Sequence, residues 1–138
     1  MLCDAGPLVA LIDSTDEHHV QCTTTLRQLP PTSLLTTWAC FAEAMYLLGK
    51  RGGFQPQDEL WGFVADGLVE LDRPEPGEWA RMREVMSKYQ DLPMDLADAS
   101  LVTAAERLSV TQVFTVDRHF HAYRISGRDP FMVIPAPA

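Results

Sequence analysis

Three acidic residues stand at positions where a carboxylate has a chemical use. Asp4 and Asp117 each come directly after a short apolar run that is typical of a buried strand. Glu43 is the single charged residue between positions 38 and 48, and a carboxylate in an apolar helix is costly to bury unless it is paired or bound to a metal. Each acid also has a structural interpretation, since Asp favours turns and helix N-caps and Glu43 could face solvent on a narrow polar face.

Asp95 and Asp98 form a further acidic pair, three residues apart at the start of the helix expected over 95–108. This spacing puts both side chains on one face of the helix. Asp95 follows Pro93 and Met94 and is a candidate N-cap, and the Asp-x-x-Asp pattern resembles a capping box. The two roles are compatible, with Asp95 capping the helix and Asp98 facing a site.

The chemistry open to these acids depends on whether they converge. Several carboxylates in one place repel one another, which raises some of their pKa values unless a cation lies among them. Because the candidate ligand atoms are all oxygens, they favour Mg²⁺ or Mn²⁺ over zinc. Such a site suits hydrolysis of a phosphodiester, since a metal can activate water and stabilise charge on the phosphoryl oxygens.

The elements that must position these acids alternate along the chain. Short apolar strands are expected over 2–4, 34–36, 68–71, 113–116 and 131–134, and helices over 16–29 (with Asp16 as the N-cap), 38–50, 56–65, 78–89 and 95–108. Gly6 and Pro7 are expected to form a turn after the first strand. This alternation predicts a three-layer α/β fold with a mostly parallel sheet. In such a sheet the reactive crevice lies at the carboxyl ends of the strands, where Asp4 and Asp117 stand.

Composition narrows the function classes. The 138 residues carry a net charge of −8, from 11 Lys and Arg against 19 Asp and Glu, which excludes a general polyanion binder with a basic surface. The length indicates a single domain over residues 1–138. No apolar run approaches the ~18 residues of a membrane span, and the start resembles no secretory signal. Three cysteines without a C-x-x-C pair indicate neither a disulfide framework nor a zinc cage. We therefore expect a reduced, cytoplasmic protein.

Four stretches that contain these acids resemble PIN-domain ribonucleases, and their size and spacing resemble the VapC-type toxins of bacterial toxin–antitoxin pairs. They span residues 4–11, 36–43, 93–102 and 115–120. Each fragment alone is weakly specific, whereas four in the family's order cover essentially the whole chain. The resemblance implies a three-layer α/β/α PIN-like domain with a mostly parallel central sheet. It also implies an endoribonuclease that uses Mg²⁺ or Mn²⁺.

The resemblance assigns roles residue by residue. It implies Asp4, Glu43, Asp98 and Asp117 as catalytic metal ligands, with Asp95 as the alternative third acid. Hydroxyl groups that stand beside such acids correspond to Thr115 and Ser100, two secondary candidates for substrate binding. The implied partners are an RNA substrate, a second copy of the chain in a homodimer and a small antitoxin that blocks the crevice. A catalytically silent PIN-like interaction module and a housekeeping RNA-processing nuclease are the alternatives.

A basic cluster follows Asp117 and comprises Arg118, His119, His121, Arg124 and Arg128. It could hold substrate phosphates beside a carboxylate pocket, with Arg118 and His119 closest in sequence, or be an ordinary solvated loop.

His18 and His19 are expected in a surface turn, because adjacent helical residues point to different sides. Trp38, Trp61 and Trp79 are expected in the core or at a dimer interface.

Two other acidic-pocket folds fail at the residues that would carry their chemistry. A response-regulator receiver domain needs two adjacent acids after its first strand and a Lys after its last, whereas Ala5 follows Asp4 and the last lysine is Lys88. A haloacid-dehalogenase-type phosphatase needs Asp-x-Asp after the first strand, where this chain has Gly6. The four filled acid positions likewise count against a silent interaction module.

Overall fold

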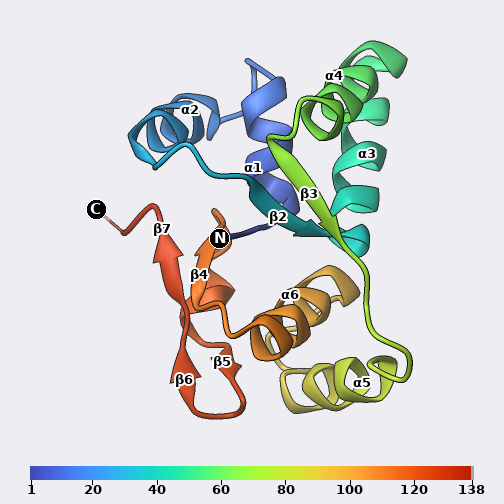
Figure 1. Ribbon diagram of the computed structural model, residues 1–138, viewed down its shortest axis with the longest axis vertical. Coiled ribbons are helices and arrows are strands. Elements are labelled where there is room, and N and C mark those ends of the chain that lie inside the picture. The colour runs from blue at the N-terminus through green and yellow to red at the C-terminus, as the bar shows by residue number, and fades with distance from the viewer. Residues whose placement is uncertain (138) are drawn as a thin grey trace.

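Five short parallel strands form the central sheet of a computed structural model, which describes residues 1–137 (Figure 1). They are β1 (Leu2–Cys3), β2 (Leu34–Thr37), β3 (Val69–Asp72), β4 (Gln112–Phe114) and β7 (Met132–Ile134), in the order β3-β2-β1-β4-β7. β1 lies at the centre, with Leu2 opposite Leu35 on one side and Val113 on the other. The order of the strands along the sheet reverses between β1 and β4, which makes their carboxyl ends the topological switch point of the fold.

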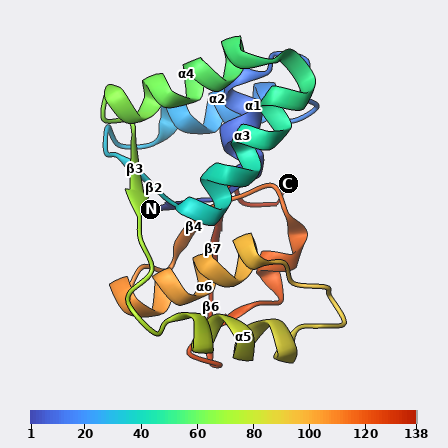
Figure 2. The same cartoon turned by 90° about the vertical axis from the view of Figure 1, so that its right-hand side faces the viewer.

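Four helices cover one face of the sheet, in the upper half of Figures 1 and 2. They are α1 (Ala5–Ile12), α2 (His19–Gln28), α3 (Trp38–Gly52) and α4 (Phe54–Ala65). α1 follows β1 directly and has buried apolar residues around most of its circumference, because it packs between the sheet and its neighbouring helices. α3 begins where β2 ends, and Thr37 caps it by accepting a hydrogen bond from the Cys40 N–H at 3.2 Å.

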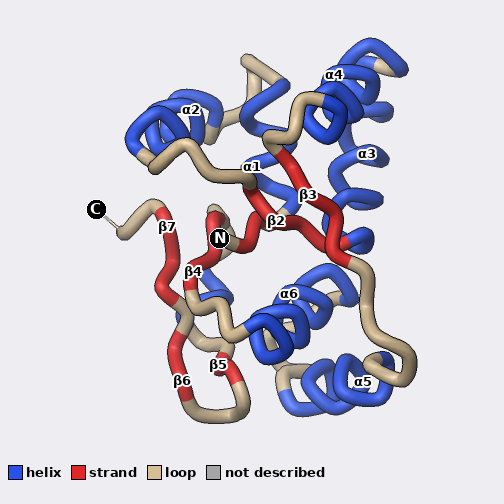
Figure 3. The backbone as a smooth tube through the Cα atoms, in the orientation of Figure 1, coloured by secondary structure: helices blue, strands red, loops and turns tan. Residues whose placement is uncertain are grey.

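The opposite face is covered by α5 (Trp79–Lys88) and α6 (Leu96–Leu108), so the strands run between two helical layers (Figure 3). A short 3₁₀ turn, η1 (Arg118–His121), and a two-stranded antiparallel hairpin, β5 (Arg124–Ile125) and β6 (Asp129–Pro130), connect β4 to β7. No helix within residues 1–137 is long and apolar enough to cross a membrane. The three-layer α/β/α arrangement confirms the predicted fold class. The single domain over 1–138 stays a prediction, and Ala138 lies outside the described residues.

The expected turn at Gly6 and Pro7 is wrong, because both residues lie in the first turn of α1. Proline is tolerated there, since the first N–H groups of a helix have no partner within it. A close approach favours glycine at position 6, because a Cβ atom there would lie 2.9 Å from Val116 Cγ2 and one of the two groups would have to shift. The start of α1 therefore packs directly on the segment that follows β4, which brings Asp4 close to Asp117.

Other boundaries differ at particular residues. Asp16 does not cap α2 but accepts a hydrogen bond from the His18 N–H at 2.9 Å, in a turn before the helix. The strand expected over 113–116 ends at Phe114. The structure also contains the β5–β6 hairpin, which the sequence did not predict. Both differences arise in a segment rich in polar and basic residues, where hydrophobic periodicity carries no signal.

The three tryptophans, expected in the core or at a dimer interface, do not lie in the core. Trp38, Trp61 and Trp79 are 38%, 44% and 66% exposed. The rings of Trp38 and Trp61 pack edge-on against Phe41, with centroids at 5.8 and 4.9 Å. Each tryptophan thus keeps part of its ring on the surface, where the predicted interface role remains open.

Candidate metal centre

Three of the predicted acids converge at the switch point of the sheet. Asp4, Asp98 and Asp117 each offer a carboxylate oxygen, and these oxygens all lie within 4.8 Å of one another. Asp4 follows β1, Asp117 follows β4, and Asp98 stands in the first turn of α6. Asp4 and Asp98 are only 7% and 6% exposed, whereas the side chain of Asp117 is 36% exposed. The cluster thus has two buried members and one facing solvent.

Thr115 ties two of these acids together. Its hydroxyl donates to Asp4 Oδ2 at 2.8 Å and accepts from the Asp117 N–H at 3.0 Å. The other carboxylate oxygen of Asp4 accepts from the Ala5 N–H at 2.7 Å, which makes Asp4 the N-cap of α1. The predicted position of the Thr115 hydroxyl beside the acids therefore matches the contacts it makes.

Asp95 and Asp98 have different roles, since one caps the helix and the other belongs to the acid cluster. Asp95 is exposed and caps α6, because its Oδ1 accepts from the Asp98 N–H at 2.8 Å. Asp98 is buried, and its Oδ2 accepts a hydrogen bond from the hydroxyl of Tyr123 at 2.9 Å. Asp98, and not Asp95, belongs to the three-carboxylate cluster.

The surroundings of the cluster disfavour negative charge. Burial raises the pKa of Asp4 to about 6, against the hydrogen bonds from Thr115 and Ala5 that favour its charged form. Burial, followed by repulsion from Asp95 and Asp4, raises the pKa of Asp98 to about 7. These carboxyl groups are therefore partly protonated near neutral pH unless a cation balances their charge.

Glu43 lies beside the cluster but outside the group of oxygens within 4.8 Å. It is half-buried on α3. Its pKa is raised, first by burial and then by repulsion from Asp95, Asp4 and Asp117. This repulsion indicates that Glu43, which stands on α3, lies close to the same site.

The donor set fits a small divalent cation. Ligand oxygens around an octahedral Mg²⁺ lie about 3 to 4 Å apart, given metal–oxygen distances near 2.1 Å. Oxygens that already lie within 4.8 Å of one another reach that spacing with small side-chain rotations. Asp4, Asp98 and Asp117 are hard oxygen donors, which suits Mg²⁺ or Mn²⁺, and a cation would offset the repulsion among them.

The remaining predicted candidates differ in their contacts. The Ser100 hydroxyl bonds to Thr37 Oγ1 and the Ala97 carbonyl, both at 2.6 Å, on the α3 side of α6. His119 is exposed, its N–H donates to Asp117 Oδ1 at 2.9 Å, and its ring Nδ1 lies 3.4 Å from the same oxygen. Arg118 is exposed next to the cluster. Their roles in substrate binding stay predictions.

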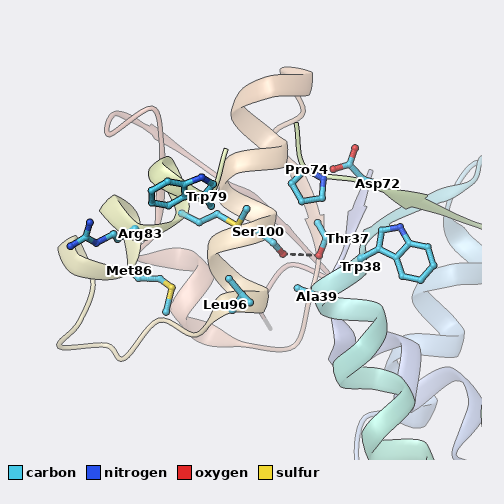
Figure 4. Close-up of a pocket in the computed structure, with 11 residues that line it drawn as sticks. Thr37, Trp38, Ala39, Asp72, Pro74, Trp79, Arg83, Met86, Leu96 and Ser100 are labelled. Carbon is cyan, nitrogen blue, oxygen red and sulfur yellow. Dashed lines mark hydrogen bonds between the residues drawn. The ribbon is translucent and has the colours of Figure 1, made fainter. Parts of the chain in front are cut away.

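An apolar groove lies near the site, between the first turns of α3 and α6 and the outer helix α5 (Figure 4). Its volume is about 510 Å³, and Trp38, Trp79, Met82, Met86 and Leu96 form its apolar walls. Figure 4 shows the Thr37–Ser100 hydrogen bond where α3 and α6 meet. Leu96 and Ser100 face this groove, whereas Asp98 points toward Tyr123.

This arrangement of acids on a parallel sheet agrees with the comparisons to known proteins. A family model described as the PIN domain matches residues 1–125. The chain belongs to the PIN domain family. A curated relative, Ribonuclease VapC26 of Mycobacterium tuberculosis (strain ATCC 25618 / H37Rv), is 29% identical over 136 residues, which cover 98% of this chain and 100% of the relative.

A solved structure shares the fold of this PIN domain. It is Mycobacterium tuberculosis VapC20, described as a sarcin–ricin loop cleaving toxin, and it aligns with a TM-score of 0.80 over 88% of this chain and 92% of its own. At 16% sequence identity this likeness concerns the fold. Both the family and the three-layer architecture expected from the sequence are thereby confirmed.

Tyr123 is the site residue of this PIN domain that the sequence did not indicate. It is fully buried and reaches Asp98 from beyond η1, 25 positions further along the chain. No motif surrounds it, and a tyrosine in a short irregular segment is usually interpreted as core. Its burial among Tyr89, Phe120 and other aromatic rings agrees with that interpretation, while its hydroxyl serves the site.

Proposed function

We propose that this chain is a metal-dependent endoribonuclease that hydrolyses RNA phosphodiester bonds and acts as the toxin of a type II toxin–antitoxin pair. The observation that carries the proposal is the convergence of Asp4, Asp98 and Asp117 at the carboxyl edge of a PIN-domain sheet. A ribonuclease that aligns over nearly the whole chain supports the same reaction. The filled acid positions disfavour a catalytically silent interaction module.

The acid cluster and the residues that contact it supply two functions in this reaction. Asp4, Asp98 and Asp117 are proposed to hold Mg²⁺ or Mn²⁺, which when bound activates water and neutralises charge on the phosphoryl oxygens. Thr115 and Tyr123 fix the orientation of Asp4 and Asp98 through their hydroxyl hydrogen bonds.

Glu43 is proposed to act from the α3 side of the site. Its half-buried carboxylate has a raised pKa, which suits a group that takes up the proton of the attacking water. Such a base would complete the set of four acids implied by the family resemblance.

RNA ends mapped after brief induction in cells test the proposed reaction. The wild-type chain is expected to create new internal RNA ends at a limited set of sites. Asp4→Asn keeps the N-cap, because Asn caps helices about as well as Asp, but removes a charge from the metal cluster. We expect the new ends to disappear with this variant at an equal level of folded protein. Identical ends from both proteins would contradict the proposal.

A small antitoxin is the proposed inhibitor. An Arg or Lys of this partner, inserted among Asp4, Asp98 and Asp117, would take the place of the metal and form charge-assisted hydrogen bonds. Cells that express the chain alone should grow more slowly than cells that also express the adjacent upstream reading frame. Equal growth, with a chain shown to be folded and to bind metal, would favour a housekeeping RNA-processing nuclease.

A homodimer is proposed through the apolar groove between α3, α5 and α6. The groove exposes Trp38 and Trp79, and apolar surface of this kind is typical of protein contacts. Asp98 does not line this groove, so a contact made there would leave the acid cluster free for RNA or inhibitor. Light scattering after size exclusion should give a dimer for the wild type and a monomer for Trp79→Glu. A dimer in both would assign the contact to another surface.

A further inference from the structure

A polar pocket of about 510 Å³ adjoins the acid cluster on the side of Asp117. His18 and Gln21, at the start of α2, form one wall, and Asp117, Arg118 and His121 form another. The segment that follows β7 lines its remaining side, in the part of Figure 1 where the C-terminal end of the chain runs beside α2. Thr115 also lines this pocket, so it is continuous with the proposed metal site.

The pocket concentrates groups that bind phosphate, in a chain of net charge −8. Arg118 is exposed and takes part in none of the ion pairs formed within residues 1–137. His18 and His121 add ring nitrogens, although His18 Nε2 also lies 3.4 Å from Glu17 Oε1. The carboxylate of Asp117 stands on the wall nearest the acid cluster.

Two further carboxylates lie close enough to the acid cluster to interact with it electrostatically, and neither of them lines this pocket. They are Glu43 and Asp95, and the repulsion between them contributes to the raised pKa of Glu43. A phosphodiester strand that leaves the cluster past these carboxylates would meet like charge. A strand that leaves past Asp117 would meet Arg118 and two histidines, so the electrostatics favour this direction.

We propose that this pocket binds a backbone phosphate of the RNA strand next to the bond that is cut. Arg118 supplies the charged contact, and His18 and His121 donate hydrogen bonds. The inference deepens the proposed ribonuclease function and rests on it. Because phosphate contacts position a nucleic acid without reading its bases, the pocket sets the direction of the strand through the site and not the sequence that is cut.

The phosphate contact of Arg118 can be tested by measuring RNA binding under conditions in which no RNA is cut. Every protein carries Asp4→Asn to prevent cutting, and a fluorescein-labelled uridylate dodecamer is the probe in anisotropy titrations at several salt concentrations. Arg118→Gln should weaken binding about 10-fold, the loss expected for one hydrogen bond to a charged group. The slope of log K against log salt should fall by about 0.7, the value for one phosphate contact of a single strand.

Arg27→Gln is the matched control, because Arg27 is exposed in the last turn of α2, takes part in none of the ion pairs within residues 1–137 and does not line the pocket. It should change affinity less than about 2-fold and leave the slope unchanged. Arg118→Lys keeps the charge and should restore the slope. Thermal melting of each variant verifies that it is folded.

Equal losses of RNA affinity for Arg118→Gln and Arg27→Gln would contradict phosphate binding in this pocket, since only the net charge would then matter. The proposal would also be contradicted if Arg118→Gln left the slope of log K against log salt unchanged, or if the Asp4→Asn parent did not bind the dodecamer. Cleavage of RNA by the protein with Asp4 intact is measured in parallel. If that cleavage is present while the pocket fails, the proposed function survives, whereas its absence contradicts the ribonuclease proposal itself.

Discussion

Each carboxylate of the cluster is held by a hydrogen-bond donor from another part of the chain or from its own turn. The Thr115 hydroxyl donates to Asp4, the Tyr123 hydroxyl to Asp98, and the His119 N–H to Asp117. These donors fix the direction of the carboxylates in the absence of a cation. Such preorganisation is what outer groups around a metal site provide.

Tyr123→Phe should lower the affinity for Mn²⁺ about 10-fold, in the range typical for loss of a group that orients a metal ligand. The ring stays, so the aromatic packing is kept while Asp98 loses its donor. Tyr89→Phe is the control, because the Tyr89 ring packs 5.1 Å from that of Tyr123 but its hydroxyl accepts from the Arg124 N–H. Calorimetric titration measures both, and equal affinities for the two variants would remove Tyr123 from the site.

Asp95→Asn and Asp98→Asn should have unequal effects on RNA cleavage. Asn caps a helix about as well as Asp, so Asp95→Asn should change the rate less than about 2-fold. Asp98→Asn removes a charge from the cluster and should abolish most activity without lowering the melting temperature. Cleavage rates and melting curves of both variants measure this. The reverse ranking of activities would make Asp95 the ligand.

α6 connects the site to the outer layer of the fold. Its first turn carries Asp98, and its last turn carries Arg107, which donates to Asp72 at 3.1 Å and to Glu78 at 2.9 Å. Arg81 on α5 pairs with Glu106 on α6 at 2.8 Å. These ion pairs hold β3, α5 and α6 together at the end of α6 remote from Asp98.

Arg107→Met should reduce the free energy of unfolding by about 2 kcal/mol, because it leaves the carboxylates of Asp72 and Glu78 without a charged donor. Urea unfolding measures the loss. Affinity for Mn²⁺ should stay within about 2-fold of the wild type, since the acid cluster lies at the other end of α6. Arg83→Met on α5 is the control, because Arg83 forms no ion pair within the described chain. Equal stability of both variants would contradict this role of Arg107.

The elements that position the site are predictable where the chain is regularly patterned. Apolar runs mark β1 and β2, helical periodicity marks α3 and α6, and the spacing of Asp95 and Asp98 predicts the cap that Asp95 forms. The start of α1 is not predictable locally, because Gly6 and Pro7 favour a turn until Val116 packs on Gly6. The contacts of Tyr123 and His18 depend on segments distant in sequence, which no local pattern encodes.

At the scale of the whole molecule, the fold gathers like charges that the unfolded chain keeps apart. Two of the acids, Asp4 and Asp98, are buried, and burial raises their pKa values from the usual 3.8 to about 6 and about 7. From the usual pKa of 3.8 up to these raised pKa values, the native metal-free protein therefore binds more protons than the unfolded chain. Stability without metal must then fall as the pH rises through this range.

The melting temperature of the metal-free protein should accordingly fall between pH 5 and pH 7, as Asp4 and Asp98 lose their protons. Saturating Mn²⁺ should reverse this trend, because the cation binds the deprotonated carboxylates. Asp98→Asn should reduce the fall in metal-free buffer. A wild-type melting temperature that rises over this range without metal, with no difference from Asp98→Asn, would contradict the raised pKa values.

The most direct test of the proposed metal centre is a metal titration of RNA cleavage by the purified chain. The protein is stripped with EDTA and dialysed, and Mg²⁺ or Mn²⁺ is then added to the wild type and to Asp4→Asn with RNA as substrate. We expect no internal cleavage by the stripped wild type, recovery as either metal is added, and at least about 100-fold slower cleavage by Asp4→Asn at the same metal concentration. RNA cleavage that persists undiminished in EDTA, or equal rates for both proteins, would contradict the proposed metal centre.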